Sequence, residues 1–331
     1  MSYISDKINK ICITGGNGFI GSAFARRVLA LKKEVLNIDA GFEGSVPVQN
    51  RTWESYGNYK LIEQDINKLD LSIKLLSFKP DLIIHFAAQS HVDESIANPQ
   101  MTYDNNLTAT INLLEATRSL YGNGLRPLFI YVSTDEVFGS LGSSGQFNEN
   151  SQILPRSPYS ASKAAGEHAV YAWHSTYDIA YLITNCSNNF GEYQHKSKLI
   201  PKLINSLYLD ETFPIYGTGL NVREWLYVED HVDAIIHLIN KGNVNDRYGI
   251  GSDVELSNID IISKIIGFHN EKNNLNLSVN DVVKFVPDRP GHDFRYSIDC
   301  SKIRATGWKP TEDFVSALRK TYEWFANFYE R

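Results

Sequence analysis

The first half of the chain alternates short apolar runs with longer stretches in which apolar residues recur every three or four positions. Short apolar runs are typical of buried strands, and the longer periodic stretches are typical of amphipathic helices. Strands are predicted at residues 11–14, 34–39, 59–63, 82–86, 128–132 and 179–186, and helices at 19–32, 69–78, 101–120 and 158–177. This alternation predicts an α/β fold with a doubly wound parallel sheet of the Rossmann type.

The pattern becomes less regular after about residue 186. Helices are still predicted at 198–209, 231–241 and 259–266, and loops at 214–219 and 287–292. We therefore expect a main domain in residues 1–186 and a smaller C-terminal lobe in residues 187–331, with the chain able to cross back between them.

Three glycines, Gly15, Gly18 and Gly21, follow the first predicted strand and open the first predicted helix. Glycines at this spacing allow a tight turn and close approach of the backbone to a pyrophosphate, which the helix N-terminus then attracts. Asp39 ends the second strand, where an acidic residue binds the adenosine ribose and repels a 2′-phosphate. These features favour NAD over NADP. The alternatives are a tight glycine turn without a ligand and, for Asp39, a helix-capping or turn aspartate.

Other residues at the carboxyl ends of the predicted strands complete the expected cofactor site. Asp65 and Ile66 are expected near the adenine, although an ordinary turn aspartate is an equal reading, and small residues after the fourth strand let backbone pass close to the cofactor. The predicted NAD-binding residues are Gly15, Gly18, Phe19, Ile20, Gly21, Asp39, Asp65, Ile66, Ala87, Ala88, Asn106, Tyr159 and Lys163.

Two adjacent carboxylates, Asp135 and Glu136, follow Thr134 at the end of the run 128–132. In open α/β sheets the ligand crevice lies outside the carboxyl ends of the strands. Like charges held close together push each other's pKa values apart. A general acid and a general base need such a separation of pKa values, so this stretch predicts acid–base chemistry.

Tyr159 and Lys163 are four residues apart on a predicted helix, so their side chains share one face. An ammonium, together with an oxidised nicotinamide, is expected to lower the pKa of a nearby tyrosine, which then can take a proton from a sugar hydroxyl. Alone, this spacing is more often an incidental surface pair. Beside a dinucleotide turn and Thr134-Asp-Glu136 it predicts a catalytic pair.

Composition excludes several other classes of function. Net charge is −6 with 43% hydrophobic residues, so no basic footprint for nucleic acid or a membrane surface is present. The first ten residues lack the apolar core of a signal peptide. The three cysteines, Cys12, Cys186 and Cys300, are widely spaced, which favours buried thiols in a reducing cytoplasm and no metal site.

With these motifs the chain resembles the extended short-chain dehydrogenase/reductases, and among them the dTDP-glucose 4,6-dehydratases. The Asp135-Glu136 pair is the specific part, since related epimerases and decarboxylases lack both carboxylates there. The resemblance covers nearly the whole chain and is carried by residues 15–22, 85–93, 132–139, 157–165, 186–191, 198–201, 221–231 and 288–299.

The resemblance implies a reaction in three stages. Tyr159 removes the O4 proton while NAD takes hydride from C4, with Thr134 on the C4 oxygen and Lys163 on the nicotinamide ribose. Glu136 then removes the C5 proton while Asp135 protonates the departing C6 hydroxyl, and hydride returns to C6. The nucleotide-sugar contacts that it implies are Ser90, Thr134, Asn188, Lys198, Leu199, Pro214, Tyr216, Arg223, Asn258, Arg289 and His292.

Several departures from the family pattern leave the nucleotide and the sugar open, so UDP-glucose or another nucleotide hexose is an alternative to dTDP-glucose. A 4-epimerase or decarboxylase, and a binding protein without turnover, are weaker alternatives. The resemblance also implies a homodimer through the helices near 101–120 and 158–177. The departures lie at Ala40–Gly44, Glu94, Asn185, Glu192 and His195–Ser197.

Overall fold

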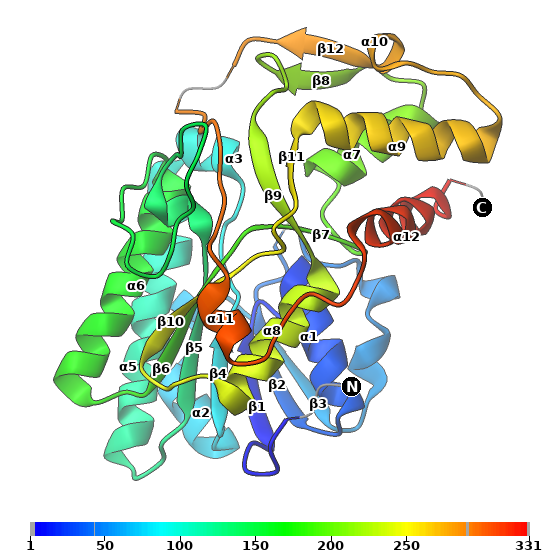
Figure 1. The fold of residues 1–331 in the computed structure, drawn as a ribbon. Helices are drawn as coiled ribbons and strands as arrows, with labels where there is room; N and C mark the ends of the chain where they lie inside the picture. The colour runs from blue at the N-terminus through cyan, green and yellow to red at the C-terminus, as the bar shows by residue number, and fades with distance from the viewer. Residues whose placement is uncertain (1–3, 43, 289–290, 330–331) are drawn as a thin grey trace.

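A seven-stranded parallel sheet forms the centre of the molecule (Figure 1), seen here in a computed structural model that describes residues 4–42, 44–288 and 291–329. The strand order is β10-β6-β5-β4-β1-β2-β3, so the order reverses between β1 and β4, as in doubly wound folds. This confirms the predicted fold class. The strands are β1 (Lys10–Thr14), β2 (Glu34–Asp39), β3 (Tyr59–Glu63), β4 (Leu82–His85), β5 (Leu128–Thr134), β6 (Tyr181–Cys186) and β10 (Asp246–Ile250).

Helices cover both faces of this sheet (Figure 1). On β1 the side chains of Ile11 and Ile13 pack in one hydrophobic cluster with Phe24, whereas Cys12 packs in a second cluster with Leu113. Successive side chains of the strand thus point to opposite faces of the sheet, where each set packs against a different layer of helices. One layer is formed by α1 (Phe19–Ala30) and α8 (Val228–Lys241), and the other by α2 (Leu71–Phe78), α5 (Ala109–Gly122) and α6 (Pro158–Tyr177).

The predicted helix at 101–120 is not one regular α-helix. A π-helical segment separates a short helix from α5, and this segment holds the buried Asn106. Such segments often occur at functional sites. The segment between β4 and α5 forms α3 (Val92–Ala97), α4 (Pro99–Tyr103) and the π-helical segment η4 (Asp104–Thr108). The 3₁₀ turns of the described residues are η1 (Val48–Asn50), η2 (Thr52–Ser55), η3 (Ile66–Lys68) and, directly after β5, η5 (Asp135–Phe138).

Local sequence explains where the two longest helices begin. Ser157 and Ser160 form a capping box at the start of α6, with Pro158 in the first turn, and α6 has the predicted bounds. Ser257 and Asp260 form another box at the start of α9 (Asn258–Asn273), which runs beyond the predicted residue 266 until Asn274 adopts a left-handed conformation.

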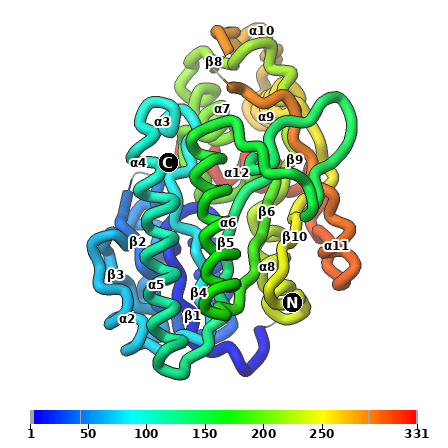
Figure 2. Tube along the Cα trace, turned by 90° about the vertical axis from the view of Figure 1, so that its left-hand side faces the viewer, coloured from blue at the N-terminus to red at the C-terminus, as the bar shows by residue number. Residues whose placement is uncertain are grey.

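A smaller lobe stands over the carboxyl ends of the central strands (Figures 1 and 2). The loop predicted at 214–219 is partly wrong, because residues 213–216 form a strand that pairs with β12. Alternate residues of this strand are buried against the lobe, which a loop would not show. The lobe contains β7 (Asn188–Phe190), β8 (Phe213–Tyr216), β9 (Val222–Tyr227), β11 (Glu255–Ser257), β12 (Val283–Val286), α7 (Leu199–Tyr208), α9, α10 (Val279–Val282) and α12 (Phe314–Ala326).

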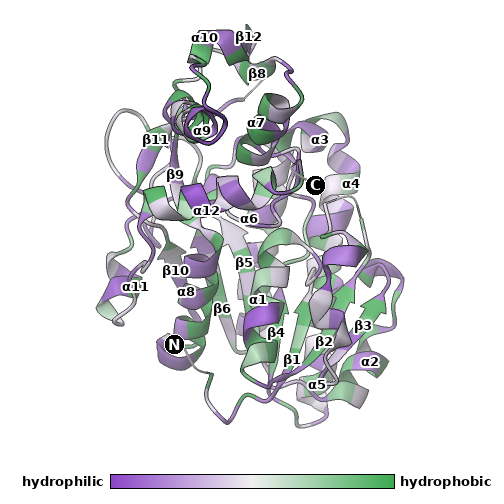
Figure 3. Ribbon diagram, turned by 90° about the vertical axis from the view of Figure 1, so that its right-hand side faces the viewer, coloured by the Kyte–Doolittle hydropathy of each residue, from purple (hydrophilic) through white to green (hydrophobic). Residues whose placement is uncertain are grey.

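The chain returns from the lobe to the central sheet. Strand β10 extends the sheet beside β6, and α11 (Ser301–Ala305) lies next to β10. Figure 3 shows that the central strands are mainly hydrophobic, whereas the covering helices carry hydrophilic and hydrophobic residues together. Within the described ranges, none of the helices combines the length and hydropathy that crossing a bilayer requires.

Candidate active site

The glycine turn after β1 lies where the strand order reverses. Gly15 has φ +72°, and a Cβ there would lie 2.6 Å from the backbone nitrogen of Ala87. A Cβ at Gly21 would overlap the carbonyl oxygen of Gly15. Because α1 starts at Gly18 without a side-chain cap, its first N–H groups are available to a phosphate. The turn therefore fits a dinucleotide pyrophosphate.

Two side chains at the end of β2 hold this turn. Asn37 Oδ1 accepts the N–H of Gly16 at 2.9 Å, and Asp39 Oδ2 accepts the N–H of Asn17 at 2.8 Å. Asp39 also accepts the N–H of Gly41 at 2.9 Å through Oδ1. Carboxylate oxygens accept more than one hydrogen bond, so Asp39 supports the turn and still fits ribose hydroxyls. The sequence reading did not find Asn37, because nothing local marks its contact with the turn.

The remaining predicted cofactor residues line the neighbouring strand ends. Asp65 caps η3 by accepting the N–H of Asn67 at 2.9 Å, which is the ordinary turn role, and Ile66 beside it is buried. Asn106 bonds both the N–H and the carbonyl oxygen of Gln89, at 2.7 and 3.1 Å, and donates to Ser162 at 2.8 Å. Asn106 thus supports the segment after Ala88. Its direct contact with NAD stays a prediction.

The acid–base pair lies in η5, directly after β5. Thr134 Oγ1 accepts the N–H of Glu136 at 3.3 Å and donates to Asp135 Oδ1 at 3.2 Å. Asp135 is buried, and its Oδ2 has no hydrogen-bond partner among the described residues. Burial, followed by the charges of Glu136 and Glu224, raises the pKa of Asp135 well above its usual value. Burial therefore favours the protonated form of Asp135, which suits this carboxyl to donate a proton.

Tyr159 and Lys163 face this turn from α6. Lys163 Nζ donates to the carbonyl oxygen of Val132 at 2.8 Å, and burial lowers the pKa of Lys163 to about 8. Burial, and then the charge of Glu136, raises the pKa of Tyr159 well above 10. The protein's own groups thus raise the pKa of Tyr159, whereas the sequence predicted that it is lowered. The positive charge of a bound oxidised nicotinamide is the group that would lower it.

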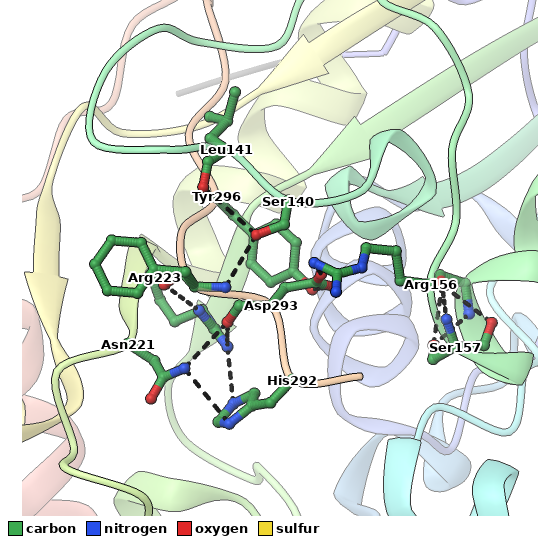
Figure 4. A network of polar contacts seen from close by, with 11 residues as sticks. Ser140, Leu141, Arg156, Ser157, Asn221, Arg223, His292, Asp293 and Tyr296 are labelled. Atoms are coloured by element: carbon green, nitrogen blue, oxygen red, sulfur yellow. Dashed lines mark hydrogen bonds and ion pairs between the residues drawn. The ribbon is translucent and has the colours of Figure 1, made fainter. Parts of the chain in front are cut away.

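A polar network joins β9 to the segment after β12 (Figure 4). Arg223 donates to His292 Nε2 at 3.1 Å and to the carbonyl oxygen of Asp293 at 3.1 Å, and Arg156 pairs with the Asp293 carboxylate at 3.0 Å. The side-chain amide of Asn221 donates to the same Asp293 carbonyl oxygen. The backbone carbonyl oxygen of Asn221 accepts the N–H of Asn258. The structure thus brings three predicted substrate residues together, namely Arg223, Asn258 and His292. Arg289 lies outside the described residues.

The other predicted substrate residues lie between the lobe and the segment after β4. Lys198 Nζ donates to the Ser90 carbonyl oxygen at 2.9 Å, and the Tyr216 hydroxyl donates to Asp93 at 3.3 Å. Asn188 Oδ1 is buried and has no hydrogen-bond partner in the described part of the chain. Leu199 begins α7 behind Lys198, and Pro214 is exposed on the same face of β8 as Tyr216.

This arrangement defines a class: a nicotinamide-dinucleotide enzyme of the short-chain dehydrogenase/reductase type, with an added pair of carboxylates. The family model described as GDP-mannose 4,6 dehydratase matches residues 12–321. The chain therefore belongs to the nucleotide-sugar 4,6-dehydratase family, among relatives named dTDP-glucose 4,6-dehydratase.

Two curated relatives and one solved structure illustrate this similarity. A probable dTDP-glucose 4,6-dehydratase of Sinorhizobium fredii is 41% identical, over 96% of this chain and 92% of the relative. The dTDP-glucose 4,6-dehydratase of Haemophilus influenzae is also 41% identical, over 95% of this chain and 97% of its own. The crystal structure of the Streptomyces venezuelae enzyme with NAD bound is 36% identical, with a TM-score of 0.86 over 96% of this chain and 97% of that one.

Three buried charged side chains near the site were missed by the sequence reading. Glu167 lies on α6 one turn after Lys163, Arg247 lies on β10, and Glu224 lies on β9, and all three are buried. The apolar residues 225–228 directly after Glu224 are the signal that could have found this glutamate, whereas Arg247 follows Asp246 in a polar stretch and has no such signal. Nothing in the local pattern of α6 separates Glu167 from an exposed helical glutamate.

Proposed function

We propose that this protein is an NAD-dependent 4,6-dehydratase that converts dTDP-glucose to dTDP-4-keto-6-deoxyglucose. The observation that carries this proposal is the buried carboxyl of Asp135 directly beside Glu136, in the turn that follows β5. Epimerase chemistry needs only proton removal at O4 and hydride transfer at C4. A paired acid and base are needed to remove water across C5 and C6.

Three side chains carry out the proton transfers, and two others support them. Tyr159 takes the proton of the C4 hydroxyl, with Thr134 as a hydrogen-bond partner of that oxygen and Lys163 at the nicotinamide ribose. Glu136 removes the C5 proton, which a 4-keto group makes acidic, and later returns a proton to C5. Asp135 gives its proton to the C6 hydroxyl as it leaves. Bound NAD supplies the acceptor and then the donor of hydride.

The cofactor and substrate would occupy the two sides of this turn. NAD fits the glycine turn and the strand ends from Gly15 to Ala88, so residues 1–186 mainly bind NAD. The lobe in residues 187–331 mainly binds the nucleotide sugar, with Arg223 placed for the diphosphate because its planar fork can bond two oxygens. UDP-glucose or another nucleotide hexose is the second candidate substrate, since Glu192 and His195 depart from the family pattern near the entrance.

The assembly and compartment follow the family resemblance and the cysteines. We infer a homodimer through α5 and α6, which an absolute mass from light scattering would test against the monomer mass of 37.4 kDa. The three cysteines are free and buried. This use of cysteine fits a reducing compartment, so we assign the protein to the cytoplasm.

The first test incubates the purified protein with dTDP-glucose, UDP-glucose or UDP-GlcNAc without added cofactor and follows the loss of one water by mass spectrometry. Loss with dTDP-glucose alone would support the reaction, retained NAD and the nucleotide together. Loss with another donor alone would keep the chemistry and change the substrate. If no donor loses water even after NAD is added, the proposed function is wrong.

A further inference from the structure

A buried amide joins the turn that carries Asp135 to the helix that carries Tyr159. Asn185, on β6, donates from Nδ2 to the carbonyl oxygen of Thr134 at 3.0 Å and to Glu167 Oε1 at 2.7 Å. The accepting carbonyl belongs to the peptide bond that enters Asp135. One side chain therefore contacts both elements that the chemistry needs.

The strand geometry places this amide on the correct face. Asn185 has the same parity along β6 as Tyr181 and Ile183, which pack in the cluster that includes Val170 of α6. It also lies opposite Ser133 in the register of β5 and β6. Its side chain consequently reaches between the end of β5 and the inner face of α6.

The chemistry of its partners fixes the orientation of the Asn185 amide. A backbone carbonyl and a carboxylate are both acceptors, so the NH₂ group must face them. A flipped amide would place Oδ1 against two acceptors. Asn185 Oδ1 has no hydrogen-bond partner among the described residues, so the two donations from Nδ2 are the hydrogen bonds of this amide within the described part of the chain.

Glu167 is held in place from its other side. Its Oε2 pairs with a guanidinium nitrogen of Arg247, and both side chains are buried. The Arg247 guanidinium also lies 5.5 Å from the ring of Tyr171 and 5.6 Å from that of Phe138. Removing one member of such a pair leaves an unpaired buried charge, so the pair holds the Glu167 carboxylate firmly.

We propose that Asn185 and Glu167 are positioning residues that set the distance between the acid–base turn and the Tyr159–Lys163 face of α6. Oxidation at C4 depends mainly on Tyr159 and Lys163 of the helix, with Thr134 as a hydrogen-bond partner of the C4 oxygen, whereas loss of water depends on Asp135 and Glu136 of the turn. The link therefore matters most for elimination, where the turn must meet a sugar already placed by the helix. This inference rests on the proposed function.

The first test replaces Asn185 with Ala, which removes both donations without adding bulk. In single turnovers, reduced-nicotinamide absorbance reports C4 oxidation, and mass spectrometry reports loss of water. We expect water loss to fall about 10- to 100-fold, since small misplacements cost this much, while oxidation changes less than about 3-fold. Asn240→Ala, which removes a distant asparagine bonded to backbone, is the matched control.

Two double variants separate positioning from general stability. Glu167→Gln with Arg247→Met removes the buried ion pair but keeps an acceptor for Asn185, whereas Glu167→Leu with Arg247→Met removes the acceptor too. We expect the first to keep the parent ratio of water loss to oxidation and the second to behave as Asn185→Ala.

Two results would overturn the inference: an unchanged ratio in Asn185→Ala, or equal ratios in the two double variants. If the parent protein removes no water from any donor, the proposed function fails first. If the parent is active and the ratios do not move, only the positioning role is wrong.

Discussion

The ammonium of Lys163 donates a hydrogen bond of 2.8 Å to the carbonyl oxygen of Val132, in the strand that ends at the catalytic turn. The same ammonium lies 4.2 Å from the ring centroid of Tyr131. The backbone carbonyl and the aromatic face restrain the position of this buried cation. Burial also removes the ammonium from water, which disfavours its charged form and lowers its pKa. The buried position of Lys163 therefore reduces the stability of the folded protein.

This cost predicts a pH dependence of folding. Burial lowers the pKa of Lys163 from 10.5 to about 8. Between these values the unfolded chain binds more protons at Lys163, so the contribution of this lysine to the free energy of unfolding rises with pH. At about 1.4 kcal/mol for each pKa unit, the whole window is worth about 3 kcal/mol. Lys163→Met should flatten this rise in urea melts of the ligand-free protein.

The measurement takes the difference in unfolding free energy between the parent and Lys163→Met at about pH 8.5 and at about pH 9.5, both of which lie between the two pKa values of Lys163. Lys74→Met, at an exposed position of α2, should keep the parent slope. Equal slopes in the parent and in Lys163→Met would show that the lysine does not titrate in this window.

Glu136→Gln tests the base. An amide cannot take the C5 proton, so 4-keto-6-deoxy product should fall by about 10²- to 10⁴-fold, the usual worth of a general base. Incubation in D₂O should also show no deuterium entering C5, while oxidation at C4 continues. Glu211→Gln, at an exposed position three residues after α7, should match the parent. Product formed by Glu136→Gln at the parent rate would assign the base elsewhere.

Asp135→Asn tests the acid and should give a different pattern. Burial raises the pKa of Asp135 and so favours its protonated form, whereas an amide of the same shape cannot pass on a proton. Product should again fall about 10²- to 10⁴-fold. Because Glu136 is intact, deuterium should still enter C5 of recovered substrate. Loss of this exchange together with product would mean that the two carboxylates do not have separate roles.

Gly15→Ala tests the cofactor turn. The positive φ and the 2.6 Å approach to the Ala87 nitrogen leave no room for a methyl group. We expect a loss of about 1–3 kcal/mol of stability, as for other strained backbone positions, and loss of NAD from the purified protein. Gly57→Ala, where a Cβ would meet nothing within 4 Å, is the control. Normal NAD content in Gly15→Ala would contradict the assigned turn.

Local patterns predicted much of the architecture. The bounds of β2, β3 and α6 agree with the predicted ranges, since short runs rich in apolar residues mark the two strands and a serine cap with a proline marks the start of α6. The segment 213–216 was partly missed because its strand is short and its partner, β12, lies about 70 residues further along. A pairing partner so distant leaves no local signal.

By itself, the sequence determined which residues stand at the ends of the strands: the glycine turn, Thr134-Asp-Glu136, and Tyr159 one turn before Lys163. Those positions follow from period and order along the chain. Only the tertiary structure decided that burial raises the pKa of Asp135, that it lowers the pKa of Lys163 to about 8, and that Asn185 joins the turn to α6. Charge state and contact depend on burial and on neighbours from distant strands, and these exist only once the chain has folded.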